Sequence, residues 1–187
     1  MWRYANNVTI KDCTFTAVEG SEAVHTAVGV KFQQAYDITL EKCTATNLHT
    51  LLQAESCGTT VTVDGATVVN GKNAISLNNT MNAIVRNSNI ESVVKGGYGI
   101  RHNGEVENYK LSVENCTVKA FVPVLIRNMT ASSYTCTLSG TNNLIETNED
   151  HDWQIVICKG DYDGTNEPVA PTGNCTLTGA ESFNVFK

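Results

Sequence analysis

A short pattern returns along the whole chain, and it constrains the fold more than any other feature of the sequence. In each copy, β-branched or other apolar residues alternate with polar ones on both sides of a turn. The copies are NVTIKDCTF at 7–15, DITLEKCTA at 37–45, TVTVDGATV at 60–68, NAIVRNSNI at 82–90, KLSVENCTV at 110–118, TCTLSGTNN at 135–143 and NCTLTGAES at 174–182. Successive copies lie 30, 23, 22, 28, 25 and 39 residues apart. A repeat of this length is typical of solenoid proteins.

Each copy predicts two short strands joined by a tight turn, because its apolar residues recur at every second position. In the first copy, Val8 and Ile10 are expected to point inward before the turn, and Cys13 and Phe15 after it. The turn position is held by Asp12, Lys42, Gly65, Asn87, Asn115, Gly140 and Gly179. Most of these are Asn or Gly, which tolerate a left-handed backbone best, so a left-handed corner is expected in every copy.

A third short apolar strand lies between the copies. It reads GVKF at 29–32, AISL at 74–77, GIRH at 99–102, VLIR at 124–127 and IVIC at 155–158, with a weaker version around 50–53. Three strands per unit describe one coil of a parallel β-helix, in which each strand pairs with its counterpart one coil away at about 4.8 Å. We therefore predict an all-β, single-stranded parallel β-helix of about seven coils. An all-β sandwich is the alternative, but a sandwich does not need one pattern at a near-constant period.

These units resemble those of right-handed parallel β-helix proteins of the pectate-lyase-like superfamily. The resemblance covers roughly residues 6–182 and is carried by the structural repeat rather than by a catalytic motif. It implies a right-handed coil. It also implies that a sugar chain would lie in a groove along one strand face, between loops of varying length.

We expect residues 1–187 to form a single domain, since this length suits one domain. The first coil starts within seven residues, too early for the capping helix with which members of the superfamily commonly begin. An open coil exposes core and unpaired backbone. The chain is therefore expected to be a fragment of a longer protein, or to have its N-terminal coil covered by a partner subunit. Residues 142–187, where the spacing swells, are expected to form irregular last coils and a C-terminal cap.

Composition and charge exclude several classes of partner. A net charge of -6 argues against binding to nucleic acid, which needs a clustered basic surface. No apolar run approaches the roughly 20 residues of a membrane-spanning helix, so no membrane insertion is expected. The seven cysteines include no CxxC pair, and five of them fall at inward positions of the repeat. Buried thiols are therefore favoured over a disulfide framework or a zinc site.

By the resemblance, the groove should follow the third strand of each coil. The outward positions of that strand are expected to be Lys31, Leu52, Ser76, Arg101, either Leu125 or Ile126, and Val156. Polar side chains and an aromatic ring near this face are the candidates for ligand binding, namely Lys31, Ser76, Tyr98, Arg101, His102, Asn103 and Arg127. His102 has two interpretations, as a half-buried ring with satisfied hydrogen bonds or as the centre of a binding triplet.

No catalytic residues can be assigned, and the balance favours a protein that is not an enzyme. Glycoside hydrolysis needs two carboxyl groups, whereas the predicted groove strands carry none. The nearest acids, Glu55 and Glu105, are expected in the loops that follow. Lys31 and Arg101 would lie about three coils apart, on the order of 14 Å, and each is expected to lack a nearby partner. An enzyme would gain support if acidic residues of 148–167 folded back beside Arg127 or Lys159.

The loop GDYDGTNE at 160–167 offers a weak calcium candidate. Asp161, Asp163 and Glu167 surround Gly164, and hard cations take oxygen ligands from tight turns of this kind. The full alternating acidic pattern is missing, so a solvated acidic loop is the favoured interpretation. No other metal and no cofactor is expected.

Taken together, these features favour a non-catalytic carbohydrate-binding or adhesive domain of a bacterial secreted or cell-surface protein, with a polysaccharide or other glycan as its partner. One alternative is a polysaccharide lyase or glycoside hydrolase acting on an acidic, plant or host glycan. The other is a structural or oligomerisation module, such as a phage-fibre segment. All three rest on analogy with the fold, which does not by itself determine function.

Overall fold

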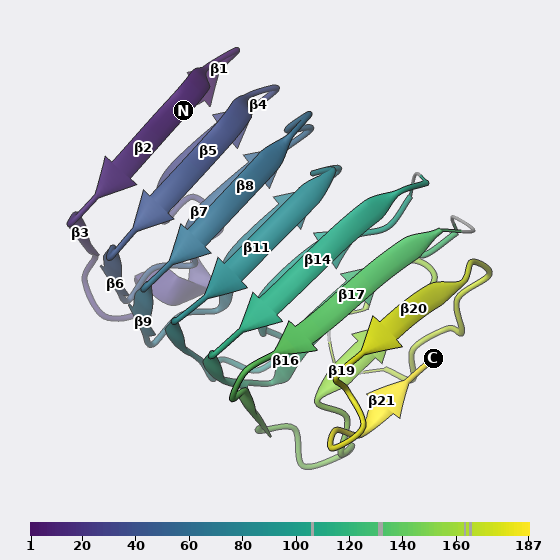
Figure 1. Cartoon of the computed structure of the whole chain (residues 1–187). Helices are drawn as coiled ribbons and strands as arrows, with labels where there is room; N and C mark the ends of the chain where they lie inside the picture. The colour runs from purple at the N-terminus through teal and green to yellow at the C-terminus, as the bar shows by residue number, and fades with distance from the viewer. Residues whose placement is uncertain (106, 131–132, 163, 165) are drawn as a thin grey trace.

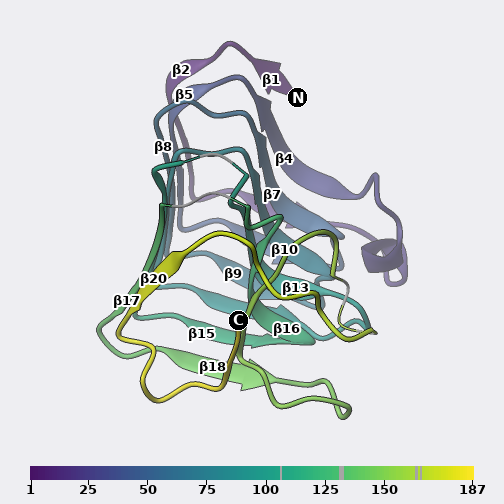
Figure 2. The same cartoon turned by 90° about the vertical axis from the view of Figure 1, so that its right-hand side faces the viewer.

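The strands of the repeat pair with their counterparts one coil away, as the sequence predicts. The computed structural model describes residues 1–105, 107–130, 133–162, 164 and 166–187. Within these residues the chain winds into a right-handed solenoid whose strands form three parallel sheets (Figure 1). Seen from the side, the strands of each sheet are stacked along the solenoid (Figure 2). One 3-10 turn, η1 (Ser21–Ala23), interrupts the strands. No helix in the described ranges is long and apolar enough to cross a membrane.

The three sheets each take one strand from nearly every coil. Sheet A contains β1 (Trp2–Arg3), β4 (Val28–Gln33), β7 (Thr50–Glu55), β10 (Asn73–Asn78), β13 (Tyr98–Asn103), β16 (Val122–Arg127), β19 (Ile155–Ile157) and β21 (Val185–Phe186). Sheet B contains β2 (Asn6–Lys11), β5 (Tyr36–Glu41), β8 (Thr60–Asp64), β11 (Asn82–Arg86), β14 (Tyr109–Glu114), β17 (Tyr134–Ser139) and β20 (Cys175–Thr178). Sheet C contains β3 (Thr14–Thr16), β6 (Thr44–Thr46), β9 (Thr67–Val69), β12 (Asn89–Ser92), β15 (Thr117–Ala120) and β18 (Asn143–Glu146).

The coil count is slightly lower than the seven predicted. Among the described strands, sheet C has six members, so six coils contribute to all three sheets. The last coil also pairs in a shifted register. The sequence pattern aligns Cys136 with Cys175, but Cys136 is opposite Leu177. A shift of two residues keeps the same side chains facing the core, because strand side chains alternate with period two.

The core consists of continuous apolar ladders that run from coil to coil. In sheet A the inward ladder comprises Val30, Leu52, Ile75, Ile100, Val124 and Ile155, all of which are buried. Five of the seven cysteines are also buried, and all seven are free thiols. A buried thiol packs as a small hydrophobic group, so the preference for thiols over a disulfide framework agrees with the structure.

All seven predicted turn residues have a positive φ, between 51° and 73°. This left-handed corner joins each strand of sheet B to the next segment of its coil. Asp12 and Lys42 adopt this corner although they are neither Asn nor Gly. The position in the coil therefore imposes the left-handed backbone, and an Asn or Gly there only lowers its free-energy cost.

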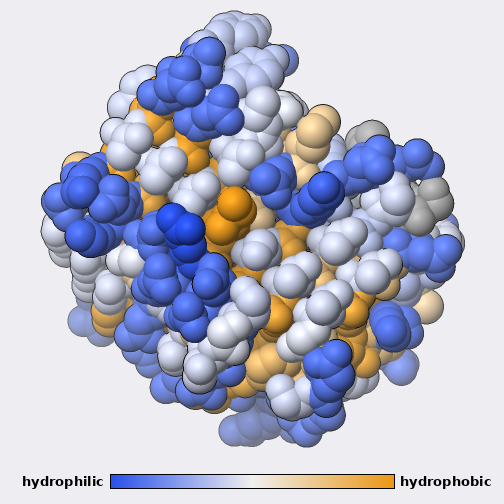
Figure 3. All heavy atoms as spheres, viewed as in Figure 1, coloured by the Kyte–Doolittle hydropathy of each residue, from blue (hydrophilic) through white to orange (hydrophobic). Residues whose placement is uncertain are grey.

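The outer face of sheet B carries a row of threonines in register, with Thr9 opposite Thr39 and Thr39 opposite Thr62. Figure 3 views this face, on which weakly polar side chains form rows with hydrophobic ones between them. Ile84 follows Thr62 in the same ladder, so the threonine row is interrupted. Threonine suits a half-exposed strand position, which is sufficient to explain the row.

The alternation of inward and outward residues can be tested on one strand. Leu40 is fully buried while its neighbour Thr39 points outward. We expect Leu40→Ala to lower the free energy of unfolding by about 2–5 kcal/mol, because it leaves a cavity in the core ladder. Thr39→Ala should cost less than about 1 kcal/mol. Denaturant unfolding followed by circular dichroism measures both, and equal losses would contradict the assignment.

Candidate ligand-binding cleft

The outer face of sheet A presents one side chain per coil in a continuous ladder. Its members are Lys31, Gln53, Ser76, Arg101, Leu125 and Val156. The ladder corrects one expected outward residue and decides between the two residues that were left open at another position. Gln53, not Leu52, faces outward, because Leu52 pairs with Val30 in the core ladder. At the β16 coil, Leu125 and not Ile126 takes the outward place.

Lys31 has a partner that the sequence analysis did not assign. Its Nζ lies 3.0 Å from Glu55 Oε1, and Gln53 Nε2 donates to the same carboxylate at 2.7 Å. The prediction that Glu55 lies in a loop is wrong, since it is the last residue of β7. Strand pairing places Glu55 beside Gln33, within reach of the lysine on the adjacent coil. Lys31 is thus neutralised within the sheet and is not among the residues that line the cleft described below.

Arg101 is held in a different way, by neutral groups. One guanidinium nitrogen, Nη2, donates to Ser76 Oγ at 2.7 Å and to Asn78 Oδ1 at 2.8 Å. The guanidinium carbon lies 4.9 Å from the centre of the Tyr98 ring. The Nε atom is buried and has no hydrogen-bond partner among the described residues. Burial lowers the pKa of Arg101, but a guanidinium remains charged at any physiological pH.

Tyr98 supports this arginine and does not form an open platform. Its side chain is 6% exposed, and burial raises its pKa. A cation above an aromatic ring is attracted by the negative face of the ring. The tyrosine therefore fixes the guanidinium at the floor of the cleft.

Arg127 lies on the next coil and pairs with an acid from outside the sheets. Its Nε donates to Asn103 Oδ1 at 3.0 Å, and its Nη1 lies 2.5 Å from Asp161 Oδ1. The arginine side chain is 21% exposed and that of Asp161 is 80% exposed. Five of the predicted binding residues therefore gather in one region, namely Ser76, Tyr98, Arg101, Asn103 and Arg127.

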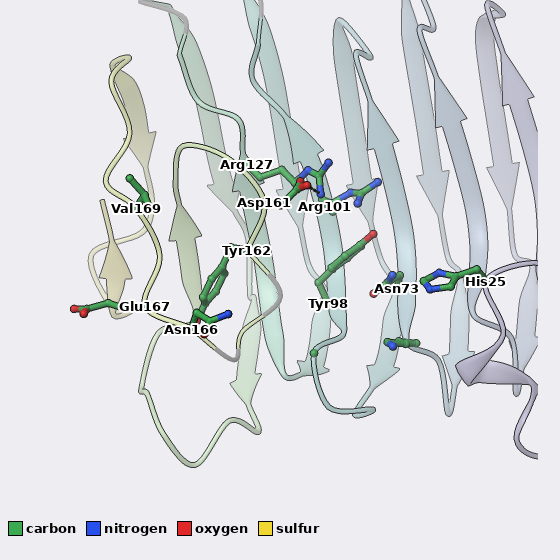
Figure 4. Close-up of a pocket in the computed structure, with 12 residues that line it drawn as sticks. His25, Asn73, Tyr98, Arg101, Arg127, Asp161, Tyr162, Asn166, Glu167 and Val169 are labelled. Atoms are coloured by element: carbon green, nitrogen blue, oxygen red, sulfur yellow. Dashed lines mark ion pairs between the residues drawn. The ribbon is translucent and has the colours of Figure 1, made fainter.

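A cleft of about 440 Å³ opens above these residues. Figure 4 shows Arg101 and Arg127 side by side, with Asp161 next to Arg127 and the Tyr98 ring below. The lining consists of His25, Lys72, Asn73, Gly96, Tyr98, Arg101, Arg127, Asp161, Tyr162, Asn166, Glu167 and Val169. Sequence reasoning did not find His25, Lys72 or Asn73, because loops or strand ends of other coils carry them and no repeat position marks them.

The far side of the cleft is formed by residues 158–162, 164 and 166–171, here called the strap. An antiparallel bridge joins Lys159 to Val169 and closes its base. Its Gly164 carbonyl accepts a hydrogen bond from Asn148 Nδ2 at 2.9 Å. Tyr162 belongs to an outer apolar cluster that includes Leu125 and Val156. The strap is thus fastened across the outer face of sheet A at several points.

His102 does not belong to the cleft, so its inclusion among the binding residues is wrong. The ring is fully buried inside the solenoid, where Nδ1 lies 2.5 Å from the Tyr134 hydroxyl and Nε2 lies 2.6 Å from the Thr80 carbonyl oxygen. A carbonyl can only accept, so Nε2 carries the proton and Nδ1 accepts from the tyrosine. This is the ring with satisfied hydrogen bonds of the first interpretation, although it is wholly rather than half buried.

The calcium candidate remains a prediction. Asp163 lies outside the described residues, and Asp161 contacts a guanidinium. Within the described parts of the chain, no group of three or more His, Cys, Asp or Glu side chains is arranged to hold a metal ion.

The stacked parallel coils and the cleft on their outer face define a right-handed parallel β-helix protein. Residues 1–161 match the family model described as the right handed beta helix region, and the chain belongs to this family. No curated protein and no solved structure matches the chain.

The burial of His102 predicts how the stability of the folded protein depends on pH. Burial lowers its pKa from 6.5 to about 4, so the folded state keeps the ring neutral while the unfolded state takes up a proton below pH 6.5. This contribution to stability is present above pH 6.5 and is lost as the pH falls towards 4. It amounts to about 2 kcal/mol between about pH 7.5 and about pH 5.

Urea unfolding at the two pH values, compared between the wild type and His102→Gln, isolates this effect. The variant should be less stable at pH 7.5 but should lose less stability on acidification. Glu146, whose pKa burial raises to about 7, acts in the opposite direction and is present in both proteins. Equal pH dependence of the two proteins would contradict the assignment to His102.

Proposed function

We propose that this chain is a non-catalytic carbohydrate-binding domain that holds a glycan in the cleft above sheet A. The observation that carries the proposal is the environment of the Arg101 side chain. It is a half-buried cation with no ion pair among the described residues, it is oriented by Ser76, Asn78 and Tyr98, and it lines a cleft. Oriented donors in a cleft of a few hundred Å³ are typical of binding sites for small polar groups.

The polar character of the surroundings supports a sugar rather than an apolar ligand. Asn73 and His25 approach from one side and the strap from the other, and Lys72 also lines the cleft. Sugar hydroxyl and carboxyl groups accept hydrogen bonds from such donors. The proposal extends to a bacterial secreted or cell-surface location, where a protein meets polysaccharides.

A polysaccharide lyase or glycoside hydrolase is the second candidate, and one observation favours it. An acid from the 148–167 region does fold back beside Arg127, namely Asp161. Hydrolysis needs a second carboxyl group about 5–9.5 Å from the first. Glu167 lines the same cleft but points away from Asp161 in Figure 4. Binding without cleavage therefore has the stronger support.

Native affinity electrophoresis against a panel of plant, host and bacterial polysaccharides tests the proposal. We expect retardation by at least one glycan, and a loss of affinity of about tenfold or more in Arg101→Gln, because a charge-assisted hydrogen bond is removed. Arg86→Gln is the matched control, since Arg86 lies on sheet B and pairs with Asp64.

Product analysis of each incubated glycan separates the two candidates. Retardation without new sugar ends supports a binding domain. New reducing ends or unsaturated products would establish an enzyme instead. If no glycan retards the protein and none is cleaved, the proposal fails and a structural or oligomerisation module becomes the better explanation.

A further inference from the structure

The carboxylate of Asp161 pairs with Arg127, one of the two arginines that line the cleft. It lies 2.5 Å from Arg127 Nη1, and the close-up view shows the Arg101 side chain next to that of Arg127 (Figure 4). Burial lowers the pKa of Arg101 most; the negative charge of Asp161 raises this pKa, and the positive charge of Arg127 lowers it. Both effects agree with the proximity of the three groups. Two adjacent guanidinium groups form a binding position for an anion, because each offers several donors in a planar fork.

The strap fixes the backbone around Asp161 but leaves its side chain accessible. On one side of this residue, Lys159 bridges to Val169, and on the other, Tyr162 packs in the outer apolar cluster. The side chain itself is 80% exposed. An ion pair exposed to this extent contributes little free energy. The carboxylate can therefore rotate away from Arg127 while the strap stays in place.

The remaining charges around the cleft are consistent with an anionic ligand. Lys72, Arg101 and Arg127 line it, in a chain whose net charge is -6. Asp161 and Glu167 are the carboxylates among the described lining residues, and both come from the strap. The strands and strand-end loops thus supply the cations, and the strap supplies the negative charge.

We propose that Asp161 is a built-in competitor that occupies an anion-binding position formed by Arg101 and Arg127. This inference rests on the glycan-binding function proposed above and specifies its ligand. The ligand is a glycan that carries carboxylate or sulfate groups, one of which displaces the Asp161 side chain and binds both guanidinium groups. Neutral glycans gain nothing from this position, so the competitor makes the cleft select for acidic sugars.

Three polymers with one backbone test the proposal, namely dextran, carboxymethyl-dextran and dextran sulfate. Affinity electrophoresis should show retardation of the wild type by at least one charged polymer, and less by dextran. Asp161→Asn should bind that charged polymer about three- to tenfold more tightly, because the competing ion pair is lost. Its affinity for dextran should not change. The polymer with the larger effect identifies whether carboxylate or sulfate is the preferred group.

Asp12→Asn is the matched control, since it makes the same change in net charge on the first coil and keeps a residue type suited to the left-handed φ of 54° there. Equal effects of the two variants would show a general charge effect and overturn the proposal. Weaker binding by Asp161→Asn would show that Asp161 contacts the ligand itself, which also overturns it. If the wild type binds a neutral glycan of the panel but none of the charged dextrans, the competitor role fails while the binding function stands. If it binds no glycan at all, both fail.

Discussion

In-register pairing between successive coils is the constraint on which the rest of this structure depends. Parallel strands that pair with their counterparts one coil away must keep the same residues inward, or a whole ladder would turn to solvent. The loops absorb the differences in coil length, and the left-handed corner after each strand of sheet B restores the path. The final coil shows how strict the rule is, because its register shifts by two residues, which preserves the inward face, and not by one.

The same pairing organises the surface charges. Several outward cations pair with a carboxylate on an adjacent coil, as in Lys31 with Glu55, Lys11 with Glu41 and Arg86 with Asp64. Individually such surface pairs contribute little to stability, but each one balances the charge of its own cation. Arg101 departs from this arrangement, since its neighbours Ser76 and Asn78 are neutral. An arginine without a charged partner among the described residues, at the floor of a cleft, supports the proposed binding site.

The sequence predicted the repeated strands and corners of the molecule, but not the structure of the loops that connect them. Third strands, left-handed corners and most outward positions follow from alternation, and they correctly brought Ser76, Arg101 and Arg127 to one face. The error at Leu52 arose because Leu51 and Leu52 are adjacent and both apolar, so alternation alone does not show which of them belongs to the core ladder. Two interpretations of His102 stayed open because alternation alone does not reveal that Tyr134 and Thr80 satisfy both ring nitrogens. The course of the strap was not predicted, because it is set by tertiary contacts such as Asn148 with Gly164.

The ladder position next to Arg101 explains why the negative charge of the cleft comes from a strap. Leu125 is the residue opposite Arg101 on the next coil, where a glutamate would pair with the guanidinium as Glu41, opposite Lys11, does with that lysine. Such a carboxylate would be held by the sheet and would neutralise the arginine permanently. Leucine instead joins the apolar cluster that anchors Tyr162, so the same position that leaves Arg101 without a strand-borne partner also fastens the segment that carries Asp161. The cations are fixed by the repeat, while the anion lies on an exposed side chain that can be displaced without disturbing a coil.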